Sequence, residues 1–415
     1  MGRPFLPSIP HTSRSLHNFR YRVAFVLLFL AIFQQQHLFH IHRQSLAAKY
    51  SSTQFSSSTE GLHPGIWRPD DEDSQFQDDL IANRASWTVL GEGWEGKVYT
   101  YRDTVIKTFT PGRSPFRNCA PGVPGQKWPT EIPASLLLGG ICKHVYIDGS
   151  KCPLNTSTTT KGFLPVKAYF TAPSSPLDSP RWYLATPRLK GGNLFNLAHK
   201  MSEGARAQNF REVDSLYRPA FNRLLGSIES LHNAGYCHDD IKPANIFVQD
   251  DTHWKLGDLG NLRHISHPYH ISRLWRDNKQ LDDCRANDVV RVLKSYLKFV
   301  QSSVYNKDQF NAAFYEGKEP ISRLFWWTLA NSPELSAAEL HQRSLIEYPE
   351  SSPSDDYLTF PLGTPRRTLA NVFSRRLALS REVDHALITR MGEKLARWWA
   401  MTWLYGVPDL EICGV

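Results

Sequence analysis

The stretch HDDIKPANI, His238 to Ile246, determines how the rest of the chain is interpreted. It sets two adjacent acids, a lysine and an asparagine directly ahead of Phe247 and Val248, an apolar pair typical of a buried strand. A solvated turn would explain any one of these polar residues by itself. The question is whether other parts of the chain supply groups that would form a single functional site with these residues.

A second acidic turn follows this stretch. The sequence KLGDLG places Asp258 after a short apolar strand and ahead of Gly260. Two acids and an amide that converge on one point suit hard Mg²⁺, which takes oxygen ligands and keeps phosphates as co-ligands. We predict Asn245 and Asp258 as the metal ligands. Asp240 would accept the proton of an attacking hydroxyl, and Lys242 would neutralise charge on the transferred phosphoryl group.

A glycine-rich turn lies near the start of the predicted folded part. GEGWEGKV contains Gly91, Gly93 and Gly96, which let backbone amides approach a phosphate without a Cβ in the way. A strand follows this turn, whereas a dinucleotide-binding loop must open a helix. The pattern therefore favours a hairpin that covers phosphates.

The next predicted strand ends in Val105-Ile106-Lys107. A lysine at the end of an apolar strand is costly to bury unless an anion meets it, and triphosphate oxygens would do so. Between Lys107 and Glu203 the only glutamate is Glu131, just ahead of a short helical run. We predict Glu131 as the partner of Lys107. The alternative is a charge at a helix start that only the macrodipole favours.

These motifs occur in a fixed order: GEGWEGKV, VIK, a glutamate near a helix, HDDIKPANI and DLG. In this order they make the chain similar to a eukaryotic protein kinase over about residues 87 to 300. The resemblance implies an α+β, bilobal protein-kinase-like fold with a small sheet-rich N-lobe and a larger helical C-lobe. It also implies ATP and Mg²⁺ as cofactors and a protein as substrate.

The same resemblance implies an adenine site. LATPRLKGGNL resembles the segment that links the two lobes of the family. There the carbonyl of Pro187 and the amide of Leu189 would bind adenine, with Thr186 at the gate position. Proline lacks the donor but keeps the acceptor that its position requires. Val98 would cover the adenine ring.

The resemblance further assigns structural positions and shows departures. His238 and Gly260 take structural places in their motifs, and Asp288 matches the buried helix acid that braces the catalytic loop. Asp239 stands where the family usually has an arginine that pairs with a phosphorylated loop. Loop phosphorylation is therefore not expected to switch this protein in the usual way. Leu259 replaces the usual phenylalanine of the metal motif.

The segment between Gly260 and Asp288 contains no APE-like element. A reduced peptide-docking platform is therefore expected, which leaves the phosphate acceptor open. The segment also carries His264, His267 and His270. We interpret these histidines as part of a polar loop in preference to a metal site.

Three functions are compatible with the sequence. The leading one is an ATP-dependent kinase that acts on Ser/Thr hydroxyls of a protein. The second keeps the chemistry and uses a small molecule as acceptor, and the third is a nucleotide-binding pseudokinase or scaffold. Lys107, Asp240, Asn245 and Asp258 are all present. This favours catalysis over a pseudokinase.

The predicted elements are strands first and helices after. Strands are expected between residues 86 and 109 and at 144–147, 163–170 and 182–186, a loop at 111–129, and helices at 215–233, 289–300 and 383–405. This order predicts an N-lobe over residues 85–190 and a C-lobe over residues 191–415. The tryptophans of the last helix are interpreted as packing within the lobe in preference to a docking surface.

The composition is that of a folded protein, with 41% hydrophobic and 12% aromatic residues. The net charge of +8 is spread thinly and forms no stripe interleaved with aromatics, so nucleic acid is not expected as a partner. The six cysteines form no CxxC pair, which argues against a zinc site or a thioredoxin-type motif. Their number leaves the redox compartment open.

The N-terminal residues 1–42 are basic and contain a hydrophobic segment over about residues 21–41, with an unbroken apolar run from Val23 to Phe33. Three interpretations compete: a single-pass signal anchor that associates the chain with a membrane, a cleaved signal peptide, or a targeting segment of a cytoplasmic or organellar protein. Residues 43–84, rich in serine and then in acids, are predicted to be a flexible linker. The sequon at Asn155 adds weak support for a lumenal domain.

Overall fold

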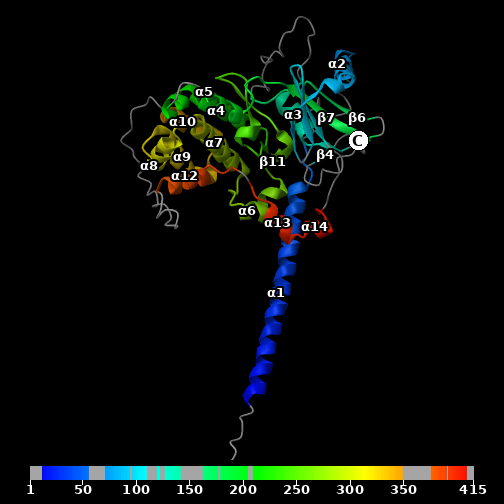
Figure 1. The fold of residues 1–415 in the computed structure, drawn as a ribbon, viewed down its shortest axis with the longest axis vertical. Coiled ribbons are helices and arrows are strands. Elements are labelled where there is room, and N and C mark those ends of the chain that lie inside the picture. Colours follow the sequence, from blue (N-terminus) through cyan, green and yellow to red (C-terminus); the bar gives the residue numbers. More distant parts are fainter. Residues whose placement is uncertain are drawn as a thin grey trace, which may run out of the picture.

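The structure is a computed structural model that describes residues 12–55, 71–93, 96–109, 119–121, 127–141, 162–175, 178–203, 209–348, 375–389 and 391–408. These residues form one lobe built on a sheet, one lobe built from helices, and a long N-terminal helix that projects from the folded part (Figure 1). The predicted α+β, two-lobed fold is confirmed. The strand predicted at 144–147 lies outside the described residues.

The smaller lobe is a five-stranded antiparallel sheet. The strands are β1 Thr88–Glu92, β2 Lys97–Tyr101, β3 Thr104–Phe109, β6 Ala168–Pro173 and β7 Pro180–Pro187, in the spatial order β1-β2-β3-β7-β6. Ile106 and Phe109 belong to hydrophobic clusters on opposite faces of β3, as the alternation of side chains along a strand requires. Lys107 lies opposite Val98 on one side and Leu184 on the other. The sheet therefore places Lys107 in its middle.

A helix packs against one face of this sheet. α3, Glu131–Gly139, buries Ile132 and Leu136 against β3 and β7. It begins at Glu131, and Pro133 fits in its first turn because a proline there removes no hydrogen bond. The loop predicted at 111–129 is partly wrong, because β4 Cys119–Pro121 and β5 Lys127–Pro129 pair as a hairpin. Strands of this length are too short to give an alternating pattern in the sequence.

Two long helices form the centre of the larger lobe. α5, Phe210–Asn233, and α7, Cys284–Ser303, contain the helices predicted at 215–233 and 289–300. Their apolar faces meet, and the rings of Phe221 and Tyr296 stack with centroids 4.4 Å apart. A capping box of Asn209 and Glu212 fixes the start of α5.

Shorter elements surround this pair. They are α4 Leu194–Glu203, β8 Tyr236–Cys237, η2 Pro243–Asn245, β9 Ile246–Val248, β10 Trp254–Leu256, η3 Leu259–Asn261, β11 Arg263–His264, η4 Pro268–Ile271, α6 Arg273–Asp277, α8 Lys307–Glu316, α9 Pro320–Asn331, η5 Ser332–Glu334, α10 Ala337–Ile346 and α12 Arg375–Ala386. β9 pairs with β10, and Ile246 lies opposite Leu256. This pairing brings the turns of HDDIKPANI and KLGDLG together.

The N-terminal helix α1, Thr12–Tyr50, is continuous with the folded part. Its portion Phe19–Tyr50 is long and apolar enough to cross a membrane, a property that a signal sequence shares. The linker predicted at 43–84 contains the end of this helix and also α2, Asp71–Ala82, with η1 Arg84–Ser86 after it. α2 buries Phe76 and Leu80 against the sheet. Two apolar residues one turn apart are too weak a signal to reveal such a helix.

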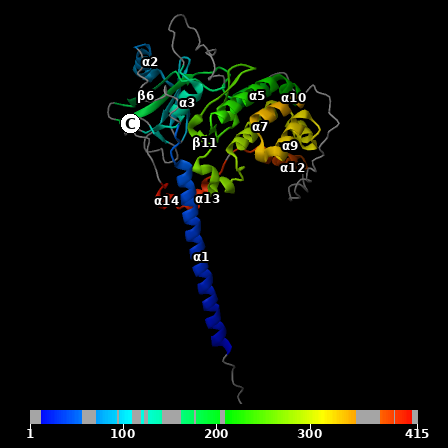
Figure 2. The ribbon, with the colours of Figure 1, turned by 180° about the vertical axis from the view of Figure 1, so that it is seen from behind.

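The helix predicted at 383–405 is divided into three pieces. After α12 come α13, Lys394–Trp399, and α14, Thr402–Tyr405, and Met401 between them adopts a left-handed backbone with φ 48°. The interpretation of the tryptophans as packing is wrong for Trp398 and Trp403, which are 59% and 72% exposed. Both short helices lie beside α1 at the lower edge of the folded part, as two opposite views show (Figures 1 and 2).

Candidate active site

A cavity of about 1040 Å³ lies between the two lobes. The residues around it that the sequence singled out are Val98, Lys107, Glu131, Thr186, Pro187, Leu189, Asn245 and Asp258. Leu164, Leu184 and Phe247 add apolar surface that the sequence analysis did not identify. A largely preformed cleft of this kind, with apolar walls and a few polar groups, is typical of a site for a small ligand.

Lys107 joins the two lobes. Its Nζ lies 2.6 Å from Glu131 Oε2 on α3 and 2.7 Å from Asp258 Oδ1 in the turn after β10. The Glu131 side chain is nearly buried, with 6% exposed. The structure therefore brings together the ammonium and the two carboxylates that the sequence singled out.

Asp258 sits at a sharp turn. Its backbone is left-handed, with φ 57°, just before η3. The charge of Lys107 is the main cause that holds the pKa of Asp258 below its ordinary value, and it outweighs burial, which raises the pKa. Asp258 is therefore an anion at neutral pH.

The loop from His238 to Asn245 forms a compact polar cluster beside this cavity. Lys242 Nζ donates to Asp240 Oδ2 at 2.6 Å. The side-chain nitrogen of Asn245 donates to the Asp240 carbonyl at 3.0 Å and to its Oδ2 at 3.3 Å. Because η2 starts with Pro243, the chain between Lys242 and Asn245 turns tightly and brings these three side chains together.

Asp288 on α7 holds the start of this loop. The carboxylate is fully buried and accepts hydrogen bonds from the backbone nitrogens of His238, at 2.6 Å, and Asp239, at 3.1 Å. The His238 ring is also buried, and its Nε2 lies 3.2 Å from the Gly257 carbonyl. Buried polar groups that are bonded in this way fix the loop relative to both α7 and the turn of Asp258.

The glycine-rich turn is described except for residues 94 and 95. The Gly93 nitrogen donates to the Gly96 carbonyl at 2.9 Å. Gly96 has φ 158°, and a Cβ at this position would overlap the Thr108 carbonyl of β3. No described residue other than its chain neighbours lies within 4 Å of the place that a Cβ at Gly91 would take, so the described packing does not require a glycine there. Gly260, in η3, lies close to the Glu131 side chain.

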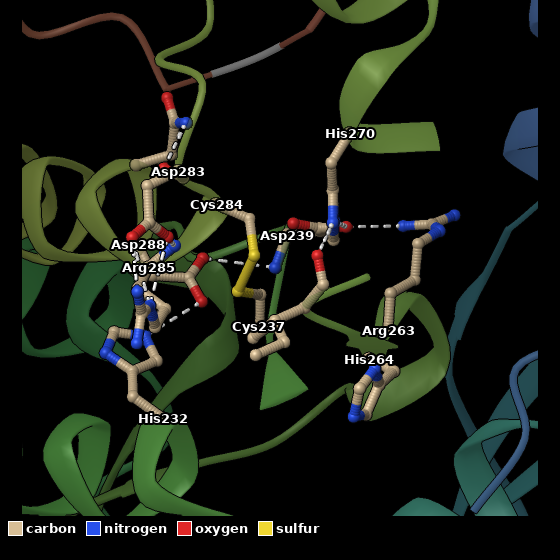
Figure 3. Close-up of a disulfide and its surroundings, with 12 residues drawn as sticks. His232, Cys237, Asp239, Arg263, His264, His270, Asp283, Cys284, Arg285 and Asp288 are labelled. Atoms are coloured by element: carbon tan, nitrogen blue, oxygen red, sulfur yellow. Dashed lines mark hydrogen bonds and ion pairs between the residues drawn. A yellow bond between two sulfur atoms is a disulfide. The ribbon is translucent and has the colours of Figure 1, made fainter. Parts of the chain in front are cut away.

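Asp239 is the centre of a buried ion network that the sequence analysis did not foresee. Its Oδ2 lies 3.0 Å from Arg263 Nη1 and 3.0 Å from His270 Nε2 (Figure 3). Arg291 donates a hydrogen bond to its backbone carbonyl. Burial alone would raise the pKa of Asp239, but the hydrogen bond and charge of His270, with Arg263 and Arg291, lower it. Asp239 therefore links the loop at His238 to the segment that follows Asp258.

The interpretation of the histidine segment as a polar loop is wrong for two of its members. His267 and His270 are buried, with 6% and 4% exposed. His267 Nε2 lies 3.2 Å from the Ser51 hydroxyl at the end of the N-terminal segment. Only His264 is exposed. Because these contacts link residues far apart in the chain, the local spacing of apolar residues in the sequence does not predict them.

A second cavity, of about 330 Å³, is lined by Asp239 and Asp240. Two of its walls come from the ends of the chain: Lys49 and Tyr50 from α1, and Glu393 and Arg397 from the α13 region. Glu393 forms an ion pair with Lys49, and it accepts from the Tyr50 hydroxyl at 2.7 Å and from Arg397 at 2.6 Å. The sequence carries no signal for this cavity.

A disulfide lies directly behind the loop. Cys237, the residue before His238, is bonded to Cys284 at the start of α7 (Figure 3). Both cysteines are buried in a cluster with Leu46 and Tyr50 of α1. Cys119 is also disulfide-bonded. The redox question that the cysteine count left open is therefore answered in favour of oxidised cysteines in the described part of the chain.

We expect the Cys237–Cys284 bond to stabilise the fold. Replacing both cysteines by alanine should lower the free energy of unfolding by about 2–4 kcal/mol, because the bond closes a long loop of the unfolded chain. The measurement is denaturant unfolding of the oxidised protein and of the double variant. A reductant should destabilise the natural protein and leave the double variant largely unchanged, and equal unfolding midpoints for the two proteins would contradict the expectation.

Comparison with known proteins agrees with this geometry. Residues 171–282 match the protein kinase domain family. A relative from Dictyostelium discoideum, named "Probable serine/threonine-protein kinase", is 33% identical over 24% of this chain and 7% of its own length. CBL-interacting serine/threonine-protein kinase 20 of Arabidopsis thaliana is 33% identical over 19% of this chain and 16% of its own.

A longer match extends over more of the chain. Serine/threonine-protein kinase UCNL of Arabidopsis thaliana is 25% identical over 43% of this chain and 38% of its own length. In each case the match covers well under two thirds of the relative. The family match and these relatives support a protein kinase-like family, so the predicted resemblance is confirmed.

Proposed function

We propose that this chain, which is protein kinase-like in sequence and in fold, transfers the γ-phosphate of ATP to a Ser/Thr hydroxyl of a protein. The observation that carries the proposal is the meeting of Lys107, Glu131 and Asp258 in the cavity between the lobes. These three groups come from different parts of the sequence. Their convergence beside Asp240 and Asn245 is what a phosphoryl-transfer site requires.

The residues present fit a magnesium ion. The Asp258 carboxylate is ionised, and the Asn245 side chain uses its nitrogen as a donor to Asp240, which leaves its oxygen as the ligand atom. Carboxylate and amide oxygens are the ligands that Mg²⁺ prefers. Asp258 and Asn245 would hold the ion, which when bound neutralises phosphate charge.

The other residues take complementary roles in this proposal. Lys107, held by Glu131, would bind the phosphates once nucleotide enters the cavity. Asp240 would accept the hydroxyl proton, and Lys242, 2.6 Å away, would stay beside it and offset negative charge. The adenine would bind at Thr186, Pro187 and Leu189 under Val98, and the turn of Gly91, Gly93 and Gly96 would cover the phosphates.

One observation favours a smaller acceptor as the second candidate. The cavity at Asp240 is about 330 Å³ and is walled by α1 and α13, so the side of the loop where an acceptor must enter is partly covered. A cavity of this size fits one side chain of a protein or a small hydroxyl compound. Radiolabel transfer from ATP to a peptide library and to a metabolite panel separates the two candidates.

We further propose that α1 is a single-pass signal anchor and that the catalytic part faces an oxidising compartment. The disulfides at Cys237, Cys284 and Cys119 support the placement of the folded part in an oxidising compartment, because disulfides persist there. The basic flank with Arg20 and Arg22 supports a cytosolic N-terminus. Resistance to carbonate extraction and protection from protease in sealed vesicles would test this orientation.

Nucleotide binding by Lys107 gives a direct test of the proposed function. Mg·ATP at about a hundredfold excess over its Kd should stabilise the protein by about 2.7 kcal/mol. The Lys107→Met variant should lose most of this stabilisation, because it removes the ammonium that meets the phosphates. The measurement is thermal unfolding with and without Mg·ATP.

Lys307→Met is the matched control, since Lys307 is exposed at the start of α8, outside the cavity. It should respond to Mg·ATP as the natural protein does. If Mg·ATP leaves the unfolding temperature of the natural protein unchanged, the proposed function is wrong.

A further inference from the structure

The two short helices near the C-terminus expose an unusual amount of apolar surface. The exposed side chains are Leu395 at 67%, Trp398 at 59%, Trp403 at 72%, Leu404 at 55% and Tyr405 at 59%. We call these five residues the aromatic foot. Contiguous exposed apolar surface on a folded protein marks a contact with another molecule or with a membrane.

The opposite side of these helices is fixed to α1. Ala396 and Ala400 are buried with Leu46 and Tyr50 in one hydrophobic cluster. α13 therefore packs along the last turns of α1 and leaves Leu395 and Trp398 exposed.

α14 extends this contact down α1, towards its N-terminus. The ring of Tyr405 lies 5.6 Å from that of Phe39. Arg43 donates to the Gly406 carbonyl at 3.1 Å. The foot therefore descends along α1 from about residue 50 to about residue 39, away from the catalytic loop.

The exposure of the α1 side chains changes near the residues that the foot contacts. Its side chains are exposed from Phe19 to His37, and Leu38 is the first that is partly buried. At about 1.5 Å per residue, the axial distance from Arg20 to Leu38 is about 27 Å. A bilayer core is about 30 Å thick. With Arg20 at one surface of the bilayer, the opposite surface falls near Leu38 and Phe39, where Tyr405 contacts the helix.

We propose that the aromatic foot lies in the interface of the bilayer leaflet from which α1 emerges. This inference rests on the proposed anchoring role of α1. Figures 1 and 2 show α13 and α14 together at the edge of the folded part from which α1 projects. Of the possible occupants of this surface, lipid fits because Tyr405 of the foot contacts Phe39 of α1, six residues beyond the exposed apolar run that ends at Phe33.

The composition of the foot supports the same occupant. Tryptophan and tyrosine concentrate at membrane interfaces, because an apolar ring with one polar atom suits the headgroup layer. Lys394 is exposed next to Leu395, and Arg43 lies beside α14, so cations accompany the rings. Contact at both α1 and the foot would fix the orientation of the folded part and hold the cavity at Asp240 at a constant height above the membrane.

The test uses the full chain in phosphatidylcholine vesicles whose acyl chains carry bromine either near the headgroup or near the chain end. Bromine quenches tryptophan fluorescence only at short range, and α1 contains no tryptophan. We expect the shallow bromine to quench the natural protein more than the deep bromine does. The double variant Trp398→Phe/Trp403→Phe should lose most of the shallow quenching. The matched control Trp254→Phe, which changes a buried tryptophan of β10, should keep it.

Carbonate extraction of the same vesicles separates the two proposals. Extraction of the natural protein would show that α1 is not an anchor, and the inference would fall with it. Retention in the membrane with equal shallow quenching in the natural protein and the double variant would overturn the inference alone. A detergent-solubilised dimer that the double variant dissociates would also overturn it, because a second copy would then cover the foot.

Discussion

Replacing Asp240 by asparagine is expected to lower the rate of phosphoryl transfer by about 10²- to 10⁴-fold. The variant keeps the size of the side chain and removes the carboxylate that would accept the proton of the hydroxyl. Asp240 lines the second cavity, whereas Lys107 lines the cavity between the lobes. The stabilisation by Mg·ATP should therefore persist in Asp240→Asn. A variant that binds Mg·ATP but transfers phosphate slowly is what the loss of a general base predicts.

Transfer from γ-labelled ATP to the acceptor found in a peptide and metabolite screen measures this effect. Asp251→Asn, an exposed acid in the turn between β9 and β10, is the matched control and should retain full activity. An Asp240→Asn variant with undiminished turnover would contradict the assigned role. Loss of both turnover and nucleotide binding would show instead that the loop had collapsed.

Replacing Asp239 by alanine is expected to lower the free energy of unfolding by about 3–5 kcal/mol, because it leaves the buried Arg263 guanidinium without its counter-charge and the buried His270 ring without its hydrogen-bond partner. Arg263 is 1% exposed and His270 is 4% exposed, so neither can turn to water without rearrangement. The contacts of Arg263 and His267 with Lys49 and Ser51 link the same segment to α1. We therefore expect the docking of α1 to loosen as well.

Denaturant unfolding of a double-mutant cycle measures this coupling. The double variant Asp239→Ala/Arg263→Met removes both charges and should be less destabilised than the sum of the two single variants. Asp282→Ala, an exposed acid ahead of α7, should change the free energy of unfolding by less than about 0.5 kcal/mol. Additive single effects would show that the two side chains do not stabilise each other in the folded protein.

The order of motifs along the chain was enough to predict the two-lobed fold and to select residues that the structure brings together. Lys107 and Glu131 could be paired because one glutamate was available over a long stretch. Asp240, Lys242 and Asn245 lie within one turn, so their proximity follows from local geometry. Strong local patterns of this kind depend little on the rest of the fold.

The ion network at Asp239 could not be predicted, although the residue itself stood out. Its partners lie in β11, η4 and α7, and only the folded chain brings them to one point. The sequence showed that Asp239 stands where protein kinases usually have an arginine. It did not show that Arg263 supplies a cation to the Asp239 carboxylate or that His270 lies within hydrogen-bond distance of it.

The role of the chain ends was also invisible in the sequence. Residues 43–53 have the composition of a linker, yet Leu46, Lys49 and Thr53 are buried against the larger lobe. Likewise, the apolar residues of a tryptophan-rich helix recur at the same spacing in the sequence whether their side chains are buried or exposed. The partner surfaces are more than 200 residues away along the chain, as in the hydrogen bond from Thr53 to the Leu262 carbonyl.

The most direct test of the central claim is an experimental structure of the full chain with Mg²⁺ and a non-hydrolysable ATP analogue. We predict the adenine at Pro187 and Leu189, the phosphates at Lys107, and the ion between Asn245 and Asp258. The hydroxyl acceptor would then have to approach from the cavity of Asp240. A nucleotide bound elsewhere, or a cavity that stays without nucleotide at saturating concentration, would contradict the account.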